Sequence, residues 1–571
     1  MKASSSDQGF FQEAPVLVNQ FHDDVVFQRA FKLFLPQQVA NRNASEIENL
    51  GEEVISDQIF NWITDSETNK PIVAVGYGKE DGAYSRVVQF LRIHLWTPSA
   101  SLVTCPSAMH DGALRLLQVH LANPKLDDER RQVFQNAVDH LLSRDPADVS
   151  LTETLATLDP SRAAGWASVK EGVALGPWSL SGFKWFSSAT DSNMTVLLAK
   201  TPKGLSAFYA PMRRSNPEAK SITGRRLGDE GTELNGIRIS RLKNKFGTQS
   251  LPTAELELNG MRGWLLGAEG KGIHQISTIL NITRIYSAVS GVGFLGRGFG
   301  VAKAYAKVRS VGAGRGRRMV LSESPLHMRT LANIAAEYQG LMHLSMLSAY
   351  TLGLEEQAVP AVELSEALKK ITPEPKHVSP LLRVISQVAK GYVCKNSITQ
   401  LYACMESLGG VGYLNNEEQE YLNISKLYRD CCVLSIWEGT TDVLSTDFIR
   451  ALLENAGIAS MEGDSRLGNW KPLQAWKAIK ARFAAETQEQ LMSEARQILW
   501  VVAEILITAL LFVDAESDKS PVASDVLHRF VVFKGLGGVQ AGIKGEGDRL
   551  AKDQAIVYGQ VYLHLRRGSE E

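Results

Sequence analysis

The chain has 571 residues, of which 44% are hydrophobic and 22% are charged, so it is long enough for about three or four globular domains. Its 61 basic residues are balanced by 62 acidic ones, and the net charge of −1 excludes a global attraction to nucleic acid or anionic lipid. The cysteines are Cys105, Cys394, Cys404, Cys431 and Cys432. An odd number without CxxC spacing argues against a disulfide framework and favours a reducing compartment.

The two ends of the sequence carry no targeting pattern. The first 24 residues, MKASSSDQGFFQEAPVLVNQFHDD, lack an apolar core and contain acids, unlike a secretory signal or an Arg-rich transit peptide. The final Gly-Ser-Glu-Glu is not a peroxisomal address. We therefore expect a cytoplasmic protein.

Residues 1–145 are predicted to form a mainly helical domain. In the stretch 111–120, Leu114 and Leu117 share one helix face, while Leu116 and Val119 lie toward another.

Strand-like runs follow and predict a small β domain over residues 146–270. They are WSLSGFKWF (178–186), NMTVLLAK (193–200), GLSAFYAPM (204–212) and AELELNG (254–260). In the last run, Ala254, Leu256 and Leu258 alternate with Glu255 and Glu257, as expected of a half-buried strand. From the pattern alone, Trp185 is predicted to be a core residue of its strand.

Long helical patterns return over residues 271–455. GVGFLG at 291–296 fits the spacing G-x-G-x-x-G, but no predicted strand precedes it, so it does not predict a dinucleotide site. We expect Gly291, Gly293, Gly296 and Gly300 to let helices pack closely, although each lowers helix propensity by about 1 kcal/mol.

A glycine cluster and a glutamate near residues 401–443 carry the densest chemistry. Gly409, Gly410 and Gly412 either cradle an anionic group such as a nucleotide phosphate or simply end a helix and form a turn. Glu438 lies between apolar residues and Gly439, which suits a general base. The alternative is an exposed acid at a helix N-terminus.

Residues 456–571 begin with a linker and continue as a helical extension. The apolar run 498–513 is too short to span a bilayer and contains Glu504, so a buried helix is predicted. The 11 histidines show no metal-ligand spacing, and no metal site is predicted.

Three segments, GGVGY (409–413), LYRD (427–430) and SIWEGTTDV (435–443), together resemble the C-terminal signature of the acyl-CoA dehydrogenase flavoprotein family. The resemblance covers about residues 85–450, and residues 97–117 also resemble the AidB-like, alkylation-response branch. It implies an α+β multidomain fold. The implied parts are a helical N-terminal domain (1–145), a central β-barrel-like domain (146–270), a C-terminal four-helix bundle (271–455) and a helical extension (456–571).

The resemblance also implies FAD as cofactor and α,β-dehydrogenation of an acyl-CoA thioester. It assigns Glu438 as the base, because Thr283 occupies the position at which some members carry their base instead. Implied flavin contacts are Trp185, Ser187, Arg309, Gly409, Gly410, Gly412 and Thr440, and implied substrate contacts are Arg284 and Gly439.

Residues 143–157, SRDPADVSLTETLAT, depart from the family pattern. The W/M-T-E and most of the G-G-S-D that hold the flavin in relatives are absent. Asp148 and Val149 resemble the tail of that motif, whereas Thr152 and Glu153 belong to the downstream segment. Two explanations remain open: a deletion introduced by the gene model, or a protein that kept the fold and lost catalysis.

Three functions follow as hypotheses. The first is an FAD-dependent dehydrogenase that forms a homotetramer, with an electron acceptor that the sequence does not identify. The second is an AidB-like, flavin-carrying and DNA-associated protection protein, for which the basic candidates are Lys471, Lys477, Lys480 and Arg482. The third is a fatty-acyl binding protein without turnover.

Overall fold

The structure is a computed structural model that describes most of the chain. The described residues are 15–56, 75–100, 104–143, 147–150, 154–158, 175–188, 190, 192–216, 220–225, 232–415, 422–454, 471–536 and 549–559. Contacts divide the chain into two compact units. Unit 1 comprises Met1–Thr68, Gly76–Ala100 and Ser287–Glu571, and unit 2 comprises Asn69–Val75 and Ser101–Tyr286. The boundary falls inside helix α9 (Gly272–Val308).

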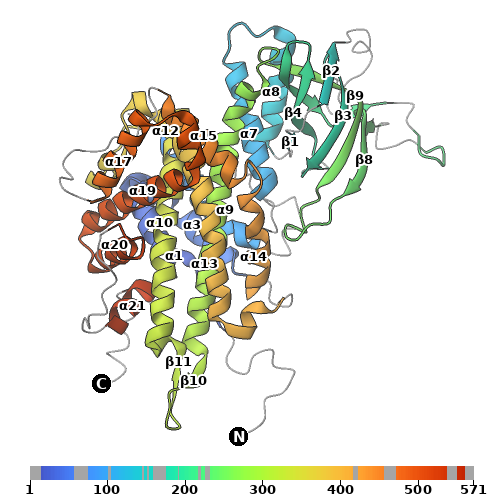
Figure 1. Cartoon of the computed structure of the whole chain (residues 1–571). Coiled ribbons are helices and arrows are strands. Elements are labelled where there is room, and N and C mark those ends of the chain that lie inside the picture. The colour runs from blue at the N-terminus through green and yellow to red at the C-terminus, as the bar shows by residue number, and fades with distance from the viewer. Residues whose placement is uncertain are drawn as a thin grey trace. The chain divides into compact units, whose positions relative to one another are not determined.

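Unit 2 combines two helices with a seven-stranded sheet (Figure 1). The helices are α7 (Thr104–Leu121) and α8 (Asp128–Ser143). The sheet contains β1 (Ala147–Ser150), β2 (Thr154–Leu158), β3 (Trp178–Ser187), β4 (Met194–Thr201), β5 (Gly204–Pro211), β8 (Ile237–Leu242) and β9 (Ala254–Leu266). Strands β6 (Arg213–Ser215) and β7 (Thr232–Leu234) form a separate pair.

The sheet closes on itself. Its order is β1-β4-β2-β3-β9-β5, and β5 also pairs with β4, so the ladders from β4 through β2, β3, β9 and β5 form a ring. Closure removes most exposed strand edges. The β-barrel-like domain expected from the sequence is therefore present.

The predicted strands β3, β4 and β5 are confirmed with shifts of about one residue, whereas β9 continues beyond its predicted end at 260 to Leu266. The buried face of β9 is confirmed at Ala254, Leu256 and Leu258. The expected outward position of Glu255 is wrong, because this side chain is only 4% exposed. Its Oε1 atom forms an ion pair with Arg241 Nε at 2.8 Å and a second one with Lys243. Paired cations let a carboxylate occupy a buried position that the alternating pattern does not anticipate.

Unit 1 is helical. Its N-terminal helices are α1 (Gln20–Asp23), α2 (Val25–Phe34), α3 (Gln37–Glu53) and α6 (Ser85–Trp96). Beyond α9 follow α10 (Pro325–Glu356), α11 (Glu366–Ile371), α12 (Val378–Val388), α13 (Cys394–Ser407), α14 (Ile424–Cys432) and α15 (Thr441–Leu453). The extension contains α17 (Lys471–Ala485), α18 (Gln488–Ser493), α19 (Ala495–Asp518), α20 (Pro521–Phe533) and α21 (Arg549–Tyr558). A short hairpin of β10 (Ser310–Gly312) and β11 (Arg318–Val320) follows α9.

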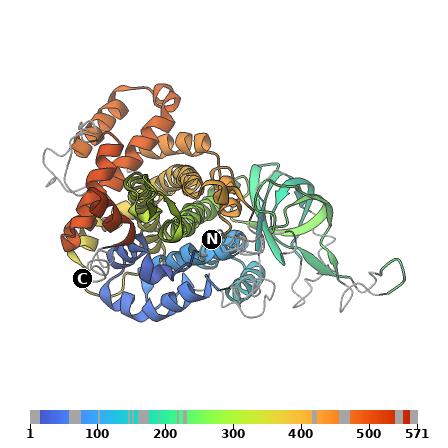
Figure 2. The same cartoon turned by 90° about the horizontal axis from the view of Figure 1, so that it is seen from below.

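Helix α10 forms the centre of unit 1. Every residue from Ile334 to Gly353 is buried, and the helix contacts α2, α6, α12, α13, α19, α20 and α21. Figure 2 shows the N-terminal helices (blue) and the extension (red) around the central helices. A helix that is buried all round is typical of the middle of a large helical core.

The four-part division predicted from the sequence remains a prediction. By contacts, the described N-terminal helices α1–α6 and the extension belong to unit 1, whereas α7 and α8 belong to unit 2 with the barrel.

Two of the predicted glycines of α9, Gly293 and Gly296, allow close helix packing, but the prediction is wrong for Gly300, where an added Cβ atom would have its nearest neighbour at 3.7 Å. A Cβ atom on Gly293 would lie 2.7 Å from the carbonyl oxygen of His94 in α6. A Cβ atom on Gly298 would lie 2.2 Å from Cδ1 of Leu401 in α13. These segments are helical throughout, so no phosphate-binding turn forms at GVGFLG.

Gly293→Ala is expected to lower the free energy of unfolding by about 1–3 kcal/mol, because the new methyl group meets a backbone carbonyl that the helix holds in place. Gly300→Ala in the same helix is the matched control, since its nearest neighbour would be Leu17 Cδ2 at 3.7 Å. In the control, the higher helix propensity of alanine should raise the free energy of unfolding by roughly 0.5–1 kcal/mol. Urea denaturation measures both, and equal effects would contradict the packing argument.

The apolar run 498–513 alone is too short to span a bilayer, but helix α19, which contains it, is longer. Its 24 residues, with a mean hydropathy of 2.3 in the most apolar window, satisfy the length and composition of a membrane span. Of that window 56% is buried, and the helix contacts α10, α15, α17 and α20. These contacts support the prediction of a buried helix.

The extension is fixed to the N-terminal helices by charged groups. Arg29 of α2 donates from Nε to Asp514 Oδ2 of α19 at 2.5 Å, and Gln339 Nε2 of α10 reaches the same oxygen at 2.8 Å. Burial alone would raise the pKa of Asp514, but His343 and Arg29 outweigh it and the pKa is lowered. The extension is therefore an integral part of unit 1.

Candidate active site

Glu438 lies in a tight turn between a 3-10 turn (Val433–Ser435) and helix α15. Its φ angle is +52° and that of Gly439 is +105°, so two consecutive residues adopt the left-handed region. A glutamate rarely adopts this conformation, and such strain is concentrated at functional sites. The alternative from the sequence was an exposed acid at a helix N-terminus. The structure does not show this, because Glu438 is half-buried and precedes the cap residue Thr440 by two positions.

The carboxylate of Glu438 is held by a serine from α9. Ser287 Oγ donates to Glu438 Oε2 at 3.2 Å, and Trp437 Nε1 donates to Ser287 Oγ at 3.1 Å. Because the indole occupies the serine oxygen as acceptor, the hydroxyl proton is directed at the carboxylate. A donated hydrogen bond favours the ionised carboxylate, which is the form that a base requires.

The turn is also held from its backbone by a buried lysine. Lys390 is 1% exposed and donates from Nζ to the carbonyl oxygen of Gly439 at 2.5 Å. It belongs to a π-helical segment (Ala389–Val393) between α12 and α13. Single π-helical turns inside α-helices occur frequently at functional sites.

Cys394 lies close to both charges. Burial raises the pKa of its thiol to about 12, the Lys390 ammonium lowers it and the Glu438 carboxylate raises it. The cysteine is therefore a protonated thiol at neutral pH, and it acts here as an apolar neighbour.

The extension supports the π-helical segment. Tyr392 donates to Glu504 Oε1 of α19 at 3.2 Å, and its ring centroid lies 5.3 Å from that of Trp500. Helix α19 thus packs against the segment that carries Lys390.

The glycine cluster follows the end of α13. Gly409 has φ +64° directly after the cap residue Leu408, so the helix-terminating interpretation is confirmed for this residue. A Cβ atom on Gly409 or Gly410 would meet nothing within 4 Å, whereas one on Gly412 would lie 2.1 Å from Met405 O. Gly409 and Gly410 leave the backbone accessible, and packing explains Gly412. The phosphate cradle remains a prediction.

Two further predicted contacts lie at helix ends in unit 1. Arg309 follows α9, where its N–H bonds the carbonyl of Tyr305 and its side chain is half-buried. Thr440 is the N-cap of α15, is exposed, and makes no side-chain capping hydrogen bond. Its hydroxyl is therefore not committed to the cap.

Trp185 lies on the surface of unit 2, so the prediction of a core tryptophan is wrong. The ladder with β9 contains a bulge between Lys184 and Ser187, and this places Trp185 (46% exposed) and Phe186 (57% exposed) both outward. The Lys243 ammonium lies 3.1 Å from the centroid of the Trp185 ring. An exposed aromatic pair beside a cation is typical of a surface that binds another group.

The remaining predicted residues of unit 2 are buried. Ser187 is fully buried at the end of β3, and Arg284 in α9 is 6% exposed. Thr283 donates to the carbonyl of Leu280 at 3.4 Å in its own helix. Arg284, Trp185 and Ser187 thus belong to unit 2, whereas Glu438 and the glycine cluster belong to unit 1.

Sequence reasoning missed Ser287 and Lys390. Ser287 lies one helical turn after Thr283, and this spacing could have identified it as a neighbour of the expected substrate position. Lys390 offers no comparable signal, because a lysine inside an apolar helical pattern is usually solvent-exposed.

The departure at 143–157 lies between helix α8 and strand β2, and the structure describes it only in part. Helix α8 ends at Ser143, β1 begins at Ala147, and Asp148 and Val149 pair in parallel with Thr195 and Val196 of β4. Thr152 and Glu153 lie outside the described residues.

Among the described residues, no cluster of His, Cys, Asp or Glu has the arrangement of a metal site. In the described part of the chain no disulfide joins any of the five cysteines, and Cys431 is buried while Cys432 is half-buried. Of the basic candidates on α17, Arg482 already pairs with Glu486 at 2.6 Å and with Glu494 at 2.9 Å. The side chain of Lys471 lies outside the described part of the chain.

Comparison with known proteins places these features in context. A family model described as the C-terminal domain of acyl-CoA dehydrogenase matches residues 270–453. The chain is 31% identical over 582 residues to acyl-CoA dehydrogenase family member 11 of Caenorhabditis elegans, covering 90% of this chain and 86% of that protein. It is 31% identical over 283 residues to AidB of Escherichia coli strain K12, covering 50% of this chain and 44% of that protein. The crystal structure of Caenorhabditis elegans ACDH-11 in complex with C11-CoA superposes with a TM-score of 0.73 at 26% identity, over 98% of each chain.

Proposed function

Because this chain belongs to the acyl-CoA dehydrogenase family and resembles its AidB-like branch, we propose that it is an FAD-dependent oxidoreductase acting on acyl-CoA thioesters. The proposed reaction removes a proton from the α-carbon and a hydride from the β-carbon, which leaves a double bond between them. The observation that supports it most directly is the strained Glu438 turn with its Ser287 and Lys390 contacts.

Glu438 is proposed as the base that takes the α-proton. Before the reaction Ser287 donates to its ionised carboxylate, and after it the protonated carboxyl keeps Ser287 as neighbour. Lys390 fixes the Gly439 carbonyl, so the carboxylate starts from one defined position. Positioning a base in this way lowers the entropic part of the barrier.

Several residues fit a bound flavin nucleotide. Trp185 presents an exposed indole face, Thr440 has an uncommitted exposed hydroxyl, and Gly409 and Gly410 leave backbone accessible to a phosphate. We propose these residues, together with Ser187, Gly412 and Arg309, as the FAD contacts, and Arg284 and Gly439 as substrate contacts. When bound, FAD supplies the acceptor for the β-hydride.

The absorption spectrum of the purified protein tests this function. We expect flavin absorption in the visible region and its anaerobic bleaching by at least one member of an acyl-CoA panel. The panel should include an 11-carbon acyl chain, because the similar ACDH-11 structure contains C11-CoA. A flavin-loaded protein that no acyl-CoA bleaches would contradict dehydrogenation.

A fatty-acyl binding protein without turnover is the second candidate, and the shortened connection between α8 and β1 favours it. It predicts a colourless protein that co-purifies with acyl ligands. Stoichiometric FAD would exclude it.

DNA association, a homotetrameric assembly and a cytoplasmic location remain proposals. DNA binding would be shown by retention of the protein on DNA at low salt that falls steeply with added salt. The ion pairs of Arg482 weaken helix α17 as the DNA-binding surface. Light scattering of the purified protein would test the tetramer.

A further inference from the structure

A row of largely buried polar groups joins the extension to the π-helical segment. Its members are Glu337 of α10, Tyr392 of the segment, Glu504 of α19 and Lys534 at the end of α20. Lys534 Nζ lies 2.6 Å from Glu337 Oε1 and 3.8 Å from Glu504 Oε1, and none of these three side chains is more than 16% exposed. Tyr392 donates to Glu504 Oε1 at 3.2 Å. Two helices of the extension are therefore linked to one segment of the bundle.

The Tyr392 hydroxyl is a permanent donor in this row. Burial, together with the charges of Glu337 and Glu504, raises its pKa, so the hydroxyl stays protonated. Burial also raises the pKa of Glu504, while Lys534 and the hydrogen bond from Tyr392 lower it. One cation serves two buried carboxylates here, and Tyr392 supplies a further donor. A buried acceptor that loses its donor is costly, so this hydrogen bond holds the segment against α19.

Lys390 and Tyr392 leave the segment on nearly opposite sides, because they are two residues apart in a helical backbone. On one side Lys390 Nζ donates to the carbonyl oxygen of Gly439 in the Glu438 turn. On the other side the Tyr392 hydroxyl donates to α19. The segment thus connects the extension to the turn through one hydrogen bond at each side.

The backbone of the segment is enclosed by the same two regions. A Cβ atom on Gly391 would lie 3.5 Å from Leu499 of α19 and 3.8 Å from Leu444 of α15, which are ordinary packing distances. A π-helical turn holds one residue more than the α-helix around it and is rare. If its anchor is lost, the extra residue can be absorbed into regular helix, and Lys390 then turns away from its acceptor.

We propose that Tyr392 and Glu504 are positioning residues for the active-site turn. By anchoring the π-helical segment to the extension, they hold the Lys390 ammonium at the carbonyl of Gly439. The effect on catalysis rests on the proposed function, whereas the effect on the turn does not. The extension thereby acts on Glu438 through two hydrogen bonds.

Amide hydrogen exchange of the full chain tests the anchor without reference to activity. Tyr392→Phe removes only the hydroxyl and should speed exchange in a peptide covering residues 433–444 by about threefold to tenfold. In that peptide the N–H groups of Ile436 and Trp437 bond the carbonyl of Val433 at 2.8 and 3.2 Å. These bonds open more often when the turn loses its contact with the segment.

A second variant breaks the same hydrogen bond from the other side. Glu504→Leu removes the acceptor of Tyr392 and leaves Lys534 paired with Glu337. It should speed exchange at residues 433–444 to a similar extent, and it serves if Tyr392→Phe does not fold. Exchange at the wild-type rate in these variants would overturn the proposal.

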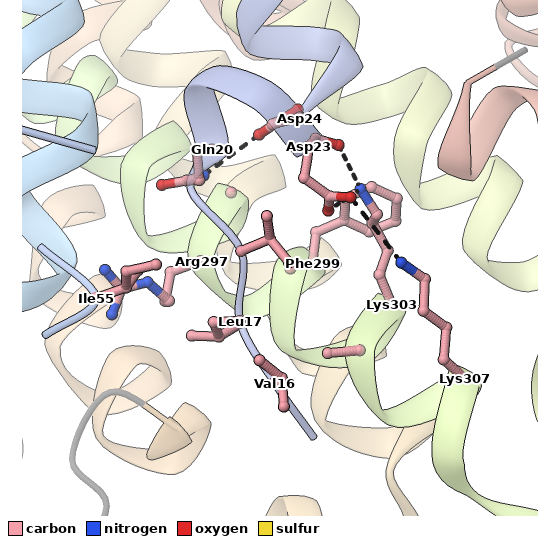
Figure 3. A pocket seen from close by; sticks show the side chains of 14 residues that line it. Val16, Leu17, Gln20, Asp23, Asp24, Ile55, Arg297, Phe299, Lys303 and Lys307 are labelled. Atoms are coloured by element: carbon pink, nitrogen blue, oxygen red, sulfur yellow. Dashed lines mark hydrogen bonds and ion pairs between the residues drawn. The ribbon is translucent and has the colours of Figure 1, made fainter. Parts of the chain in front are cut away.

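The matched control is Tyr338→Phe in α10. The Tyr338 hydroxyl also donates to a buried carboxylate, Asp24 Oδ2, at 2.8 Å. Asp24 lines a cavity beside α9 (Figure 3), and none of the described residues that line this cavity belongs to the π-helical segment or to the Glu438 turn. The control loses the same kind of hydrogen bond and should keep wild-type exchange at residues 433–444.

Steady-state kinetics with acyl-CoA test the catalytic consequence. Tyr392→Phe should lower kcat by about threefold to tenfold with little change in KM, whereas Tyr338→Phe should keep the wild-type kcat. Because Tyr392 acts through Lys390, adding Tyr392→Phe to Lys390→Met should cause no further loss of kcat. Losses that multiply in the double variant would overturn the proposal. If the wild-type protein oxidises no acyl-CoA, the proposed function fails, and the exchange rates alone decide the positioning role.

Discussion

Glu438→Gln is expected to slow the reduction of bound flavin by acyl-CoA by about two to four orders of magnitude, while FAD content stays at the wild-type level. The amide has nearly the same shape as the carboxylate, so the turn and its hydrogen bond from Ser287 remain possible. It cannot accept a proton from an unactivated carbon. Anaerobic stopped-flow measurement of flavin bleaching gives the rate.

The matched control for this prediction is Glu355→Gln, an exposed glutamate near the end of α10. It changes the same charge without touching the turn and should reduce flavin at the wild-type rate. If Glu438→Gln bleaches as fast as the wild type, Glu438 is not the base. If instead the variant loses FAD, its role is structural rather than chemical.

Lys390→Met is expected to lower kcat by about one to two orders of magnitude and to reduce stability by about 1–3 kcal/mol. Methionine fills similar space but leaves the carbonyl of half-buried Gly439 without this donor. The left-handed conformation of Glu438 then loses the contact that fixes its neighbour. Steady-state kinetics and urea denaturation measure the two effects.

The pH profile of kcat distinguishes an effect of Lys390 on Glu438 from a general loss of stability. Lys390 Nζ bonds the carbonyl of the residue next to Glu438, and a nearby cation favours the ionised form of a carboxylate. Without this cation, Glu438 should take up a proton at higher pH, so the acid limb of the pH profile of kcat should move to higher pH. Lys390→Arg keeps the charge and should keep the wild-type limb. An unshifted limb in Lys390→Met would show that the lysine acts on stability alone.

Much of the local structure could be predicted from the sequence. Strand-like runs predicted β3, β4 and β5 nearly in full and about the first half of β9, and helical patterns predicted the long helices of unit 1. The glycines of α9 were predicted to serve packing because no strand precedes them, and the structure agrees at Gly293 and Gly296. These features depend on residues close in the chain, whose conformational preferences act directly on the local backbone.

Exposure at individual positions was less predictable. Trp185 lies outward because a bulge in the ladder with β9 shifts the alternation, and Glu255 lies inward because Arg241 and Lys243 come from the neighbouring strand and loop. Both outcomes depend on how two strands align, which neither strand encodes alone.

The sequence by itself determined the family signature around Glu438 and the periodic elements that carry it. Only the tertiary structure decided which groups hold Glu438, since Ser287 lies 151 residues away in the chain and Lys390 reaches the turn from a π-helical segment. The physical reason is that a charge or hydrogen bond acts through a few ångströms of space, and distances between remote residues arise only when helices pack.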